Sequence, residues 1–200
     1  MMQPSVRLRL ILATIATLNL AYFGLEVVVA LTIGSVALFA DSIDFLEDAA
    51  INLLILAGLA WSARARSHLG MVLAGILLAP GFATLWMAAR QFSLGSIPAP
   101  TALGLTGAGA LLVNGTCALL LTRHRNSGGS LVRAAFLSAR NDVIANLAII
   151  VIAPISFLLQ SRWPDLILGV AIGVLNAGAA WEVFEAARGE RLNANEGSLS

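Results

Sequence analysis

The sequence predicts an all-α integral membrane protein, a bundle of six transmembrane helices with both termini in the cytoplasm. Of its 200 residues, 58% are hydrophobic and 12% are charged, and the mean hydropathy is +0.88. The chain contains no lysine, and this composition excludes an ordinary water-soluble globular domain. Apolar stretches of about 20 residues recur along the whole chain, and each is long enough to cross a bilayer about 30 Å thick.

Hydropathy places the spans at residues 8–32, 36–61, 69–91, 101–122, 132–158 and 164–186. The first apolar run follows a short basic segment, as a signal peptide does, but it extends past Val29 without a small-residue cleavage pattern, which favours a retained span. Pro80 and Pro154 fall inside the third and fifth spans, where neighbouring helices can absorb a kink. Gly169 and Gly173 form a GxxxG pattern in the sixth span, which permits close helix contact.

The arginines predict the orientation of the chain, because cytoplasmic loops carry an excess of positive charge. With six spans, one side of the membrane receives Arg7, Arg9, Arg64, Arg66, Arg123, Arg125, Arg133, Arg188 and Arg191. The opposite side receives Arg90 and Arg162. We therefore expect a multi-pass protein of the cell inner (plasma) membrane. Residues 1–187 would form the six-helix transmembrane domain, and residues 188–200 a short disordered cytoplasmic tail.

Four carboxylates lie within the second span, in the segment GSVALFADSIDFLED. A charged side chain near the bilayer centre costs about 3 kcal/mol even on the mildest insertion scale, so the cluster requires water, protons or a cation. On a helix, Asp41, Asp44, Asp48 and Asn52 project within an arc of about 80°, and Glu47 lies outside it. Asp44 and Asp48 are one turn apart, so both can reach a single divalent cation. They are the candidate ligands on this span.

A metal site also needs ligands from a second helix, and the fifth span supplies candidates. In AAFLSARNDVIANLAII, Ser138, Asn141 and Asp142 share a face, and Asn146 continues it one turn further. The alternative is that the acids form hydrogen bonds between helices or pair with Arg140. That alternative would explain one or two carboxylates, whereas four in one span favour an ion pathway.

Several other polar residues of the predicted spans have roles that the spacing alone leaves open. Asp41 lies nearest the extracytoplasmic end and is expected either in the cavity or as a partly solvated residue at the start of its helix. Asn19, Tyr22 and Glu26 follow helical spacing in the first span. They either line the same cavity, with Glu26 as a proton carrier, or form interhelical hydrogen bonds. Asp165 is expected to cap the N-terminus of its own helix.

These residues resemble the cation diffusion facilitators, a family of six-helix transporters that export divalent metal ions. The similarity is most specific at GSVALFADSIDFLEDAAINLL, which is similar to the family's second-span signature. It continues in RAAFLSARNDVIANLAII and WPDLILGVAIGVL, which resemble the fifth and sixth spans. The resemblance implies a transport site formed by Asp44 and Asp48 with Asp142 and the residue at position 138.

The chain departs from the family pattern at two points. Position 138 is Ser, where the family usually has His or Asp, so the site becomes almost entirely oxygen, and Asn141 or a water could fill the vacancy. The family's cytoplasmic C-terminal domain, which assists dimerisation and metal sensing, is expected to be absent. A homodimer would therefore form through membrane helices.

The predicted activity is efflux of a divalent transition metal by proton antiport with alternating access. The family favours zinc and admits cadmium, whereas the oxygen ligands leave manganese, iron or cobalt as the alternative cargo. Metal binding requires deprotonated carboxylates, and the emptied cluster is expected to take up protons.

A membrane-embedded metalloenzyme is the rival function, but it calls for histidines at membrane depth, and His68 and His124 lie in predicted loops. We expect no enzymatic activity, no cofactor and no nucleic-acid partner. The expected partners are divalent metal ions, protons and the lipid bilayer.

Overall fold

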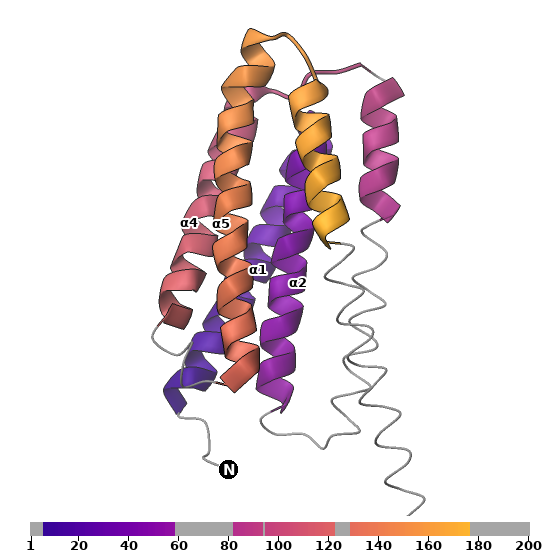
Figure 1. Ribbon diagram of the computed structural model, residues 1–200. Helices are drawn as coiled ribbons and strands as arrows, with labels where there is room; N and C mark the ends of the chain where they lie inside the picture. The colour runs from indigo at the N-terminus through magenta and orange to yellow at the C-terminus, as the bar shows by residue number, and fades with distance from the viewer. Residues whose placement is uncertain (1–5, 59–81, 94, 123–128, 177–200) are drawn as a thin grey trace, which may run out of the picture.

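The computed structural model describes residues 6–58, 82–93, 95–122 and 129–176, which form an all-α bundle (Figure 1). The described helices are α1 (Val6–Ile33), α2 (Val36–Gly58), residues 82–93, α4 (Pro100–Thr122), α5 (Gly129–Leu158) and Trp163–Asn176. The predicted all-α fold and the order of its six helices are thus confirmed. α5 continues through Pro154. Pro80, both histidines and the predicted tail lie outside the described residues.

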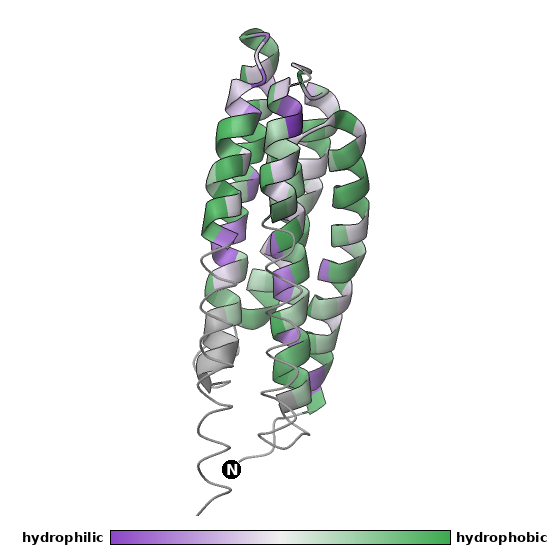
Figure 2. Ribbon diagram, turned by 90° about the vertical axis from the view of Figure 1, so that its right-hand side faces the viewer, coloured by the Kyte–Doolittle hydropathy of each residue, from purple (hydrophilic) through white to green (hydrophobic). Residues whose placement is uncertain are grey.

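Three of the described helices are long and apolar enough to cross a membrane: Val6–Ile33, Pro100–Thr122 and Ala135–Leu158. α2 has 23 residues and is long enough, but it is not among these three helices. Every 18-residue stretch within it contains all four carboxylates of the second predicted span. Figure 2 shows hydrophobic residues along every described helix. On α4, the side chains of Leu105, Leu112 and Leu119 are 71%, 72% and 74% exposed, as expected of a face that meets lipid.

Four helices form the central bundle. α1 packs along α2, α4 packs along α5, and contacts of α1 with α4 and of α2 with α5 join the two pairs. One apolar layer lies near the start of α1 and includes Leu12, Ile15, Ile55, Cys117 and Leu121. A second lies toward the other end and includes Ala30, Leu38, Leu103, Ile149 and Ala153. The helix segments between these layers carry most of the buried polar residues, which places that polar group at mid-depth in the bundle.

The remaining two described helices, 82–93 and Trp163–Asn176, stand beside α2 (Figure 1). A Cβ at Gly169 would lie 2.5 Å from the Val36 carbonyl carbon, so only glycine allows this approach to α2. A Cβ at Gly173 would lie 2.8 Å from Cγ2 of Thr84. The close contact that the GxxxG pattern predicted is therefore confirmed, and it joins three helices.

Asp165 caps a different helix from the one the sequence predicted. Its Oδ2 accepts a hydrogen bond from the Val36 backbone N–H at 2.8 Å, and its Oδ1 accepts one from the Ser35 hydroxyl at 2.5 Å. Gln91 Nε2 also donates to Oδ2, at 2.9 Å. Because Trp163–Asn176 crosses beside the start of α2, the carboxylate reaches that N-terminus rather than its own. The expectation that it caps its own helix was wrong.

Candidate metal centre

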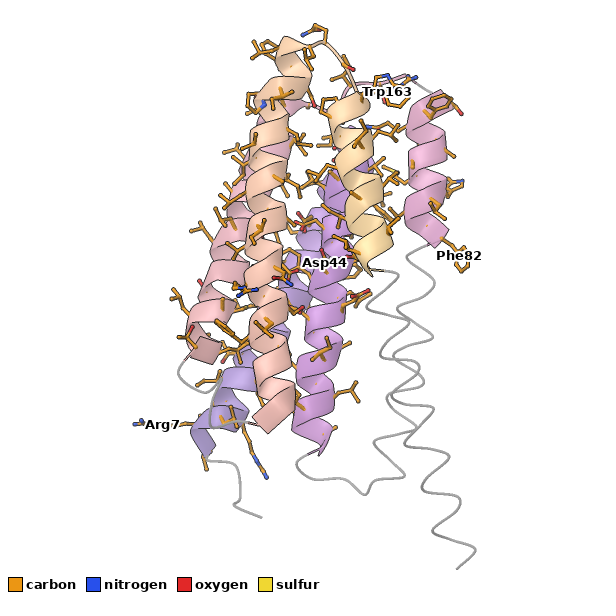
Figure 3. All side chains as sticks on the ribbon, in the orientation of Figure 1. Arg7, Asp44, Phe82 and Trp163 are labelled. Carbon is orange, nitrogen blue, oxygen red and sulfur yellow. The ribbon has the colours of Figure 1, made fainter. Side chains whose placement is uncertain are left out.

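The polar layer of the bundle draws side chains from all four central helices. Its members are Asn19, Glu26, Asp41, Asp44, Asp48, Asn114, Asp142 and Asn146. Figure 3 labels Asp44 at mid-height of the bundle, where α2 faces α5. The layer lies between two apolar layers, so a charge here is far from both ends of the bundle.

Asp48 is the centre of contact between α2 and α5. The Ser138 hydroxyl donates a hydrogen bond to Asp48 Oδ1 at 2.8 Å. The carboxyl of Asp142, one turn further along α5, lies within hydrogen-bonding reach of the Asp48 carboxyl. Asp48 is 2% exposed, whereas Ser138 and Asp142 are half-buried. The packing of α2 on α5 thus brings three of the predicted ligands together.

Asp44 adds a third carboxylate one turn away from Asp48 on α2. It is half-buried, and Asp142 is the charged group that acts on it most strongly. Among the described residues, no three His, Cys, Asp or Glu side chains already converge on one point as a metal site. A divalent cation would have to draw the three carboxylates together, and its charge would offset their mutual repulsion.

Asn141 is not brought to this group. Its side chain is exposed, and its Oδ1 accepts a hydrogen bond from Arg140 Nη2 at 3.4 Å. Arg140 is exposed as well, so the contact that the structure records for it is with its neighbour rather than with a carboxylate of the layer. The alternative in which Arg140 neutralises the acids therefore finds no support in the described residues.

Asp41 belongs to a second polar group on the same helix. It is fully buried, and both of its oxygens accept hydrogen bonds from Asn146 Nδ2, at 2.9 and 2.7 Å. Asn114 Nδ2 in turn donates to Asn146 Oδ1 at 3.1 Å. Partial solvation of Asp41 was a wrong expectation, because α2 begins at Val36 and α5 covers the second turn. Interhelical hydrogen bonding, the alternative for the acids, accounts for both oxygens of Asp41 and one oxygen of Asp48, but it leaves Asp44 unexplained among the described residues.

Which buried carboxyls have hydrogen-bond partners could not be predicted from the sequence. Glu26 is fully buried, and neither of its carboxyl oxygens has a hydrogen-bond donor in the described part of the chain. Glu47 is 8% exposed, and its Oε1 is also without a donor there. Helical spacing placed Glu26 on a shared face with Asn19 and Tyr22, but spacing does not say what the neighbouring helices present to it.

Comparison with known protein families agrees with this architecture. The profile of the cation efflux transmembrane domain matches residues 12–189, which include all six described helices in whole or large part and every residue of the polar layer. A search of curated proteins found no match to this chain. The matching family consists of transporters and is not an enzyme family. The chain therefore belongs to the cation diffusion facilitator family and is a divalent cation efflux transporter.

Proposed function

We propose that the cargo is zinc, with cadmium as a second cargo, and that the metal binds between α2 and α5. The observation that carries the proposal is the contact of Asp48 with Ser138 and Asp142 at mid-depth in the bundle. Asp44, Asp48 and Asp142 supply three carboxylate ligands, and the Ser138 hydroxyl or a water completes four-coordination. Asn141, which is exposed, has the least support among the predicted ligands.

The proposed transport cycle exchanges metal for protons by alternating access. A carboxylate binds metal only when it is deprotonated, so metal uptake from the cytoplasm releases protons from the site. When the metal leaves on the other side, like charges remain buried together, and protons neutralise them for the return step. The two flows are coupled because neither the bare charged site nor a site that holds both cargoes is favourable.

Manganese, iron or cobalt is the second candidate cargo. The observation that favours it is Ser138, whose hydroxyl replaces a nitrogen ligand and leaves a site of oxygen donors.

The excess of arginine on one side supports the inner membrane and the export direction. A homodimer would form through lipid-facing helix surfaces such as that of α4.

The test is metal uptake into proteoliposomes that contain a pH-sensitive dye. We expect Asp48→Ala and Asp142→Ala each to lower zinc uptake at least about tenfold and to abolish the coupled proton flux, since each removes a charged ligand. Asp165→Asn is the matched control, because it changes a buried aspartate outside the polar layer. It should retain uptake per folded molecule. Unchanged uptake and proton flux in both alanine variants would refute the site.

A further inference from the structure

We propose that Glu26 of α1, facing Asp41 of α2, is a proton-binding site distinct from the metal ligands. The proposal rests on the metal–proton exchange proposed above and assigns the exchanged proton a place. Glu26 is 0% exposed, and both of its carboxyl oxygens are without a hydrogen-bond donor among the described residues. An ionised carboxylate in that position is strongly disfavoured, whereas a protonated one is a neutral group that can donate a hydrogen bond.

The acceptor for that hydrogen bond is Asp41. The Glu26 and Asp41 carboxyls lie within hydrogen-bonding reach of each other, and two carboxyl groups can be joined only when one carries a proton. Asp41 already accepts two hydrogen bonds from Asn146, which marks it as the acceptor. The proton therefore belongs to Glu26.

The part of the chain that the structure describes offers no other means of neutralising Glu26. From α2 it faces Asp41 and Asp44, both acidic. On its own helix the nearest titratable group is Tyr22, whose hydroxyl is committed to the Thr106 carbonyl of α4 at 2.6 Å. The amides that α4 and α5 contribute to this group, Asn114 and Asn146, are uncharged and bonded to each other. Among the described residues, no arginine contacts Glu26.

A proton suits this position better than a second metal ion. The Asn146 amide turns its nitrogen toward Asp41 and its oxygen toward Asn114, so it offers no ligand atom to a cation here. Two carboxylates remain, and structural or transport metal sites use about four ligands. Asn114 Oδ1 is the one amide oxygen of Asn19, Asn114 and Asn146 that has no donor among the described residues, and it would bring the number of ligands to three, still short of four.

The location also provides a route for coupling. Asp41 and Asp44 are less than one turn apart on α2, and Asp44 acts electrostatically on Glu26. A dication held by Asp44 and Asp48 places positive charge next to the Glu26–Asp41 pair and favours loss of its proton. Metal binding to Asp44 and Asp48 thereby expels a proton from the neighbouring Glu26–Asp41 pair, without that proton ever residing on a ligand.

The decisive variant is Glu26→Gln, which keeps the size and removes the titratable proton. In proteoliposomes we expect about one fewer proton released per zinc bound, and because zinc and the proton are linked, zinc affinity should depend less on pH than in wild type. Stimulation of zinc uptake by an acidic lumen should fall by at least half, and Glu26→Asp should restore part of it. Ser156→Ala is the matched control, since Ser156 is also fully buried, its hydroxyl has no hydrogen-bond partner within the described ranges, and it does not titrate.

Unchanged proton release and unchanged pH stimulation in Glu26→Gln would overturn the proposal. A second measurement uses wild-type protein and stands even if the variant fails to fold: labelling with dicyclohexylcarbodiimide, which modifies protonated carboxyls in apolar surroundings. Mass spectrometry should find the label on Glu26, and zinc should suppress it. Absence of label on Glu26 at every pH would also overturn the proposal. If wild-type vesicles take up no metal, the proposed function fails, and the pH dependence of the label still decides whether Glu26 binds a proton.

Discussion

Ser138 joins the two helices of the candidate metal site through a hydroxyl 2.8 Å from Asp48 Oδ1. A hydroxyl is a weak ligand, whereas imidazole nitrogen favours zinc over manganese. We predict that Ser138→His tightens zinc binding about tenfold and raises the ratio of zinc to manganese affinity. Competition with a metal-sensitive dye in detergent would measure both affinities. Ser138→Ala, which removes the hydroxyl without adding a ligand, is the control, and equal gains for both metals in Ser138→His would contradict the assignment.

Asn146 is the residue on which the buried charge of Asp41 depends. Replacing it by leucine, which has similar size, removes two hydrogen bonds from Asp41 and one from Asn114. We predict that Asn146→Leu lowers the free energy of unfolding by about 3 kcal/mol, since buried polar groups lose their partners. Denaturation in detergent micelles measures the change. Adding Asp41→Asn should recover part of the loss, because the remaining group is then neutral, and a loss below about 1 kcal/mol would refute this role for Asn146.

Sequence reasoning at the residue scale could predict which side chains share a face, and little more. Helical spacing placed Asp44 with Asp48, and Ser138 with Asp142, because that depends only on the 3.6-residue repeat. It also placed Asn141 with Asp142, although the structure leaves Asn141 exposed. How α5 is rotated about its own axis decides which of its polar side chains face α2. The residue pattern of α5 alone does not determine that rotation.

At the scale of elements, the start of α2 is held by side chains from two other helices. Asp165 accepts hydrogen bonds from the Val36 N–H, the Ser35 hydroxyl and Gln91, and its charge faces the positive end of the α2 dipole. The turn before α2 places Gly34 at φ 72°, a conformation that favours glycine. Gln91 also donates to the Gly34 carbonyl, so the turn and the cap form one unit.

We predict that Asp165→Asn costs about 1 kcal/mol, because it retains the shape and loses the charge at the helix N-terminus. Asp165→Ala should cost about 3 kcal/mol, since it leaves several buried donors without an acceptor. Thermal unfolding in detergent would rank the two variants. Equal stability of both variants with wild type would show that the hydrogen bonds at the start of α2 contribute nothing.

The helices themselves could be predicted because each is a long apolar run that must satisfy its backbone internally in lipid. The bounds of α4 differ from the predicted span by a single residue at one end, since Pro100 and the polar end of the segment mark it. The partner of Asp165 could not be predicted. Its local sequence is that of an N-terminal cap, and only the crossing of two helices distant in sequence determines which N-terminus the carboxylate reaches.

At the scale of the whole molecule, the arrangement is an acidic layer enclosed by two apolar layers. Among the described residues of this layer the charged groups are acidic, so its neutrality depends on what binds there. Composition predicted a membrane protein, and the hydropathy profile along the chain predicted six helices. Neither predicted that four helices would form the bundle and two would stand beside α2, since hydropathy does not say which helices pack against each other.

The direction of the chain across the membrane is the remaining property of the whole molecule, and one that labelling can test. The start of α1, the end of α2 and the start of α5 lie at one end of the bundle, and Gln160 follows α5 at the other (Figure 1). Since Arg7 and Arg9 belong to the first end, the positive-inside rule places that end in the cytoplasm. Cys117, the only native cysteine, can be replaced by alanine so that single cysteines report position.

We predict that a membrane-impermeant maleimide added to intact cells labels Gln160→Cys and leaves Val6→Cys unlabelled until the membrane is permeabilised. Both side chains are exposed, and neither substitution removes an arginine that sets the orientation. The opposite pattern would invert the chain and turn the proposed export into import. Labelling of both sites in intact cells would indicate a mixture of orientations, which is incompatible with an arginine distribution that fixes one of them.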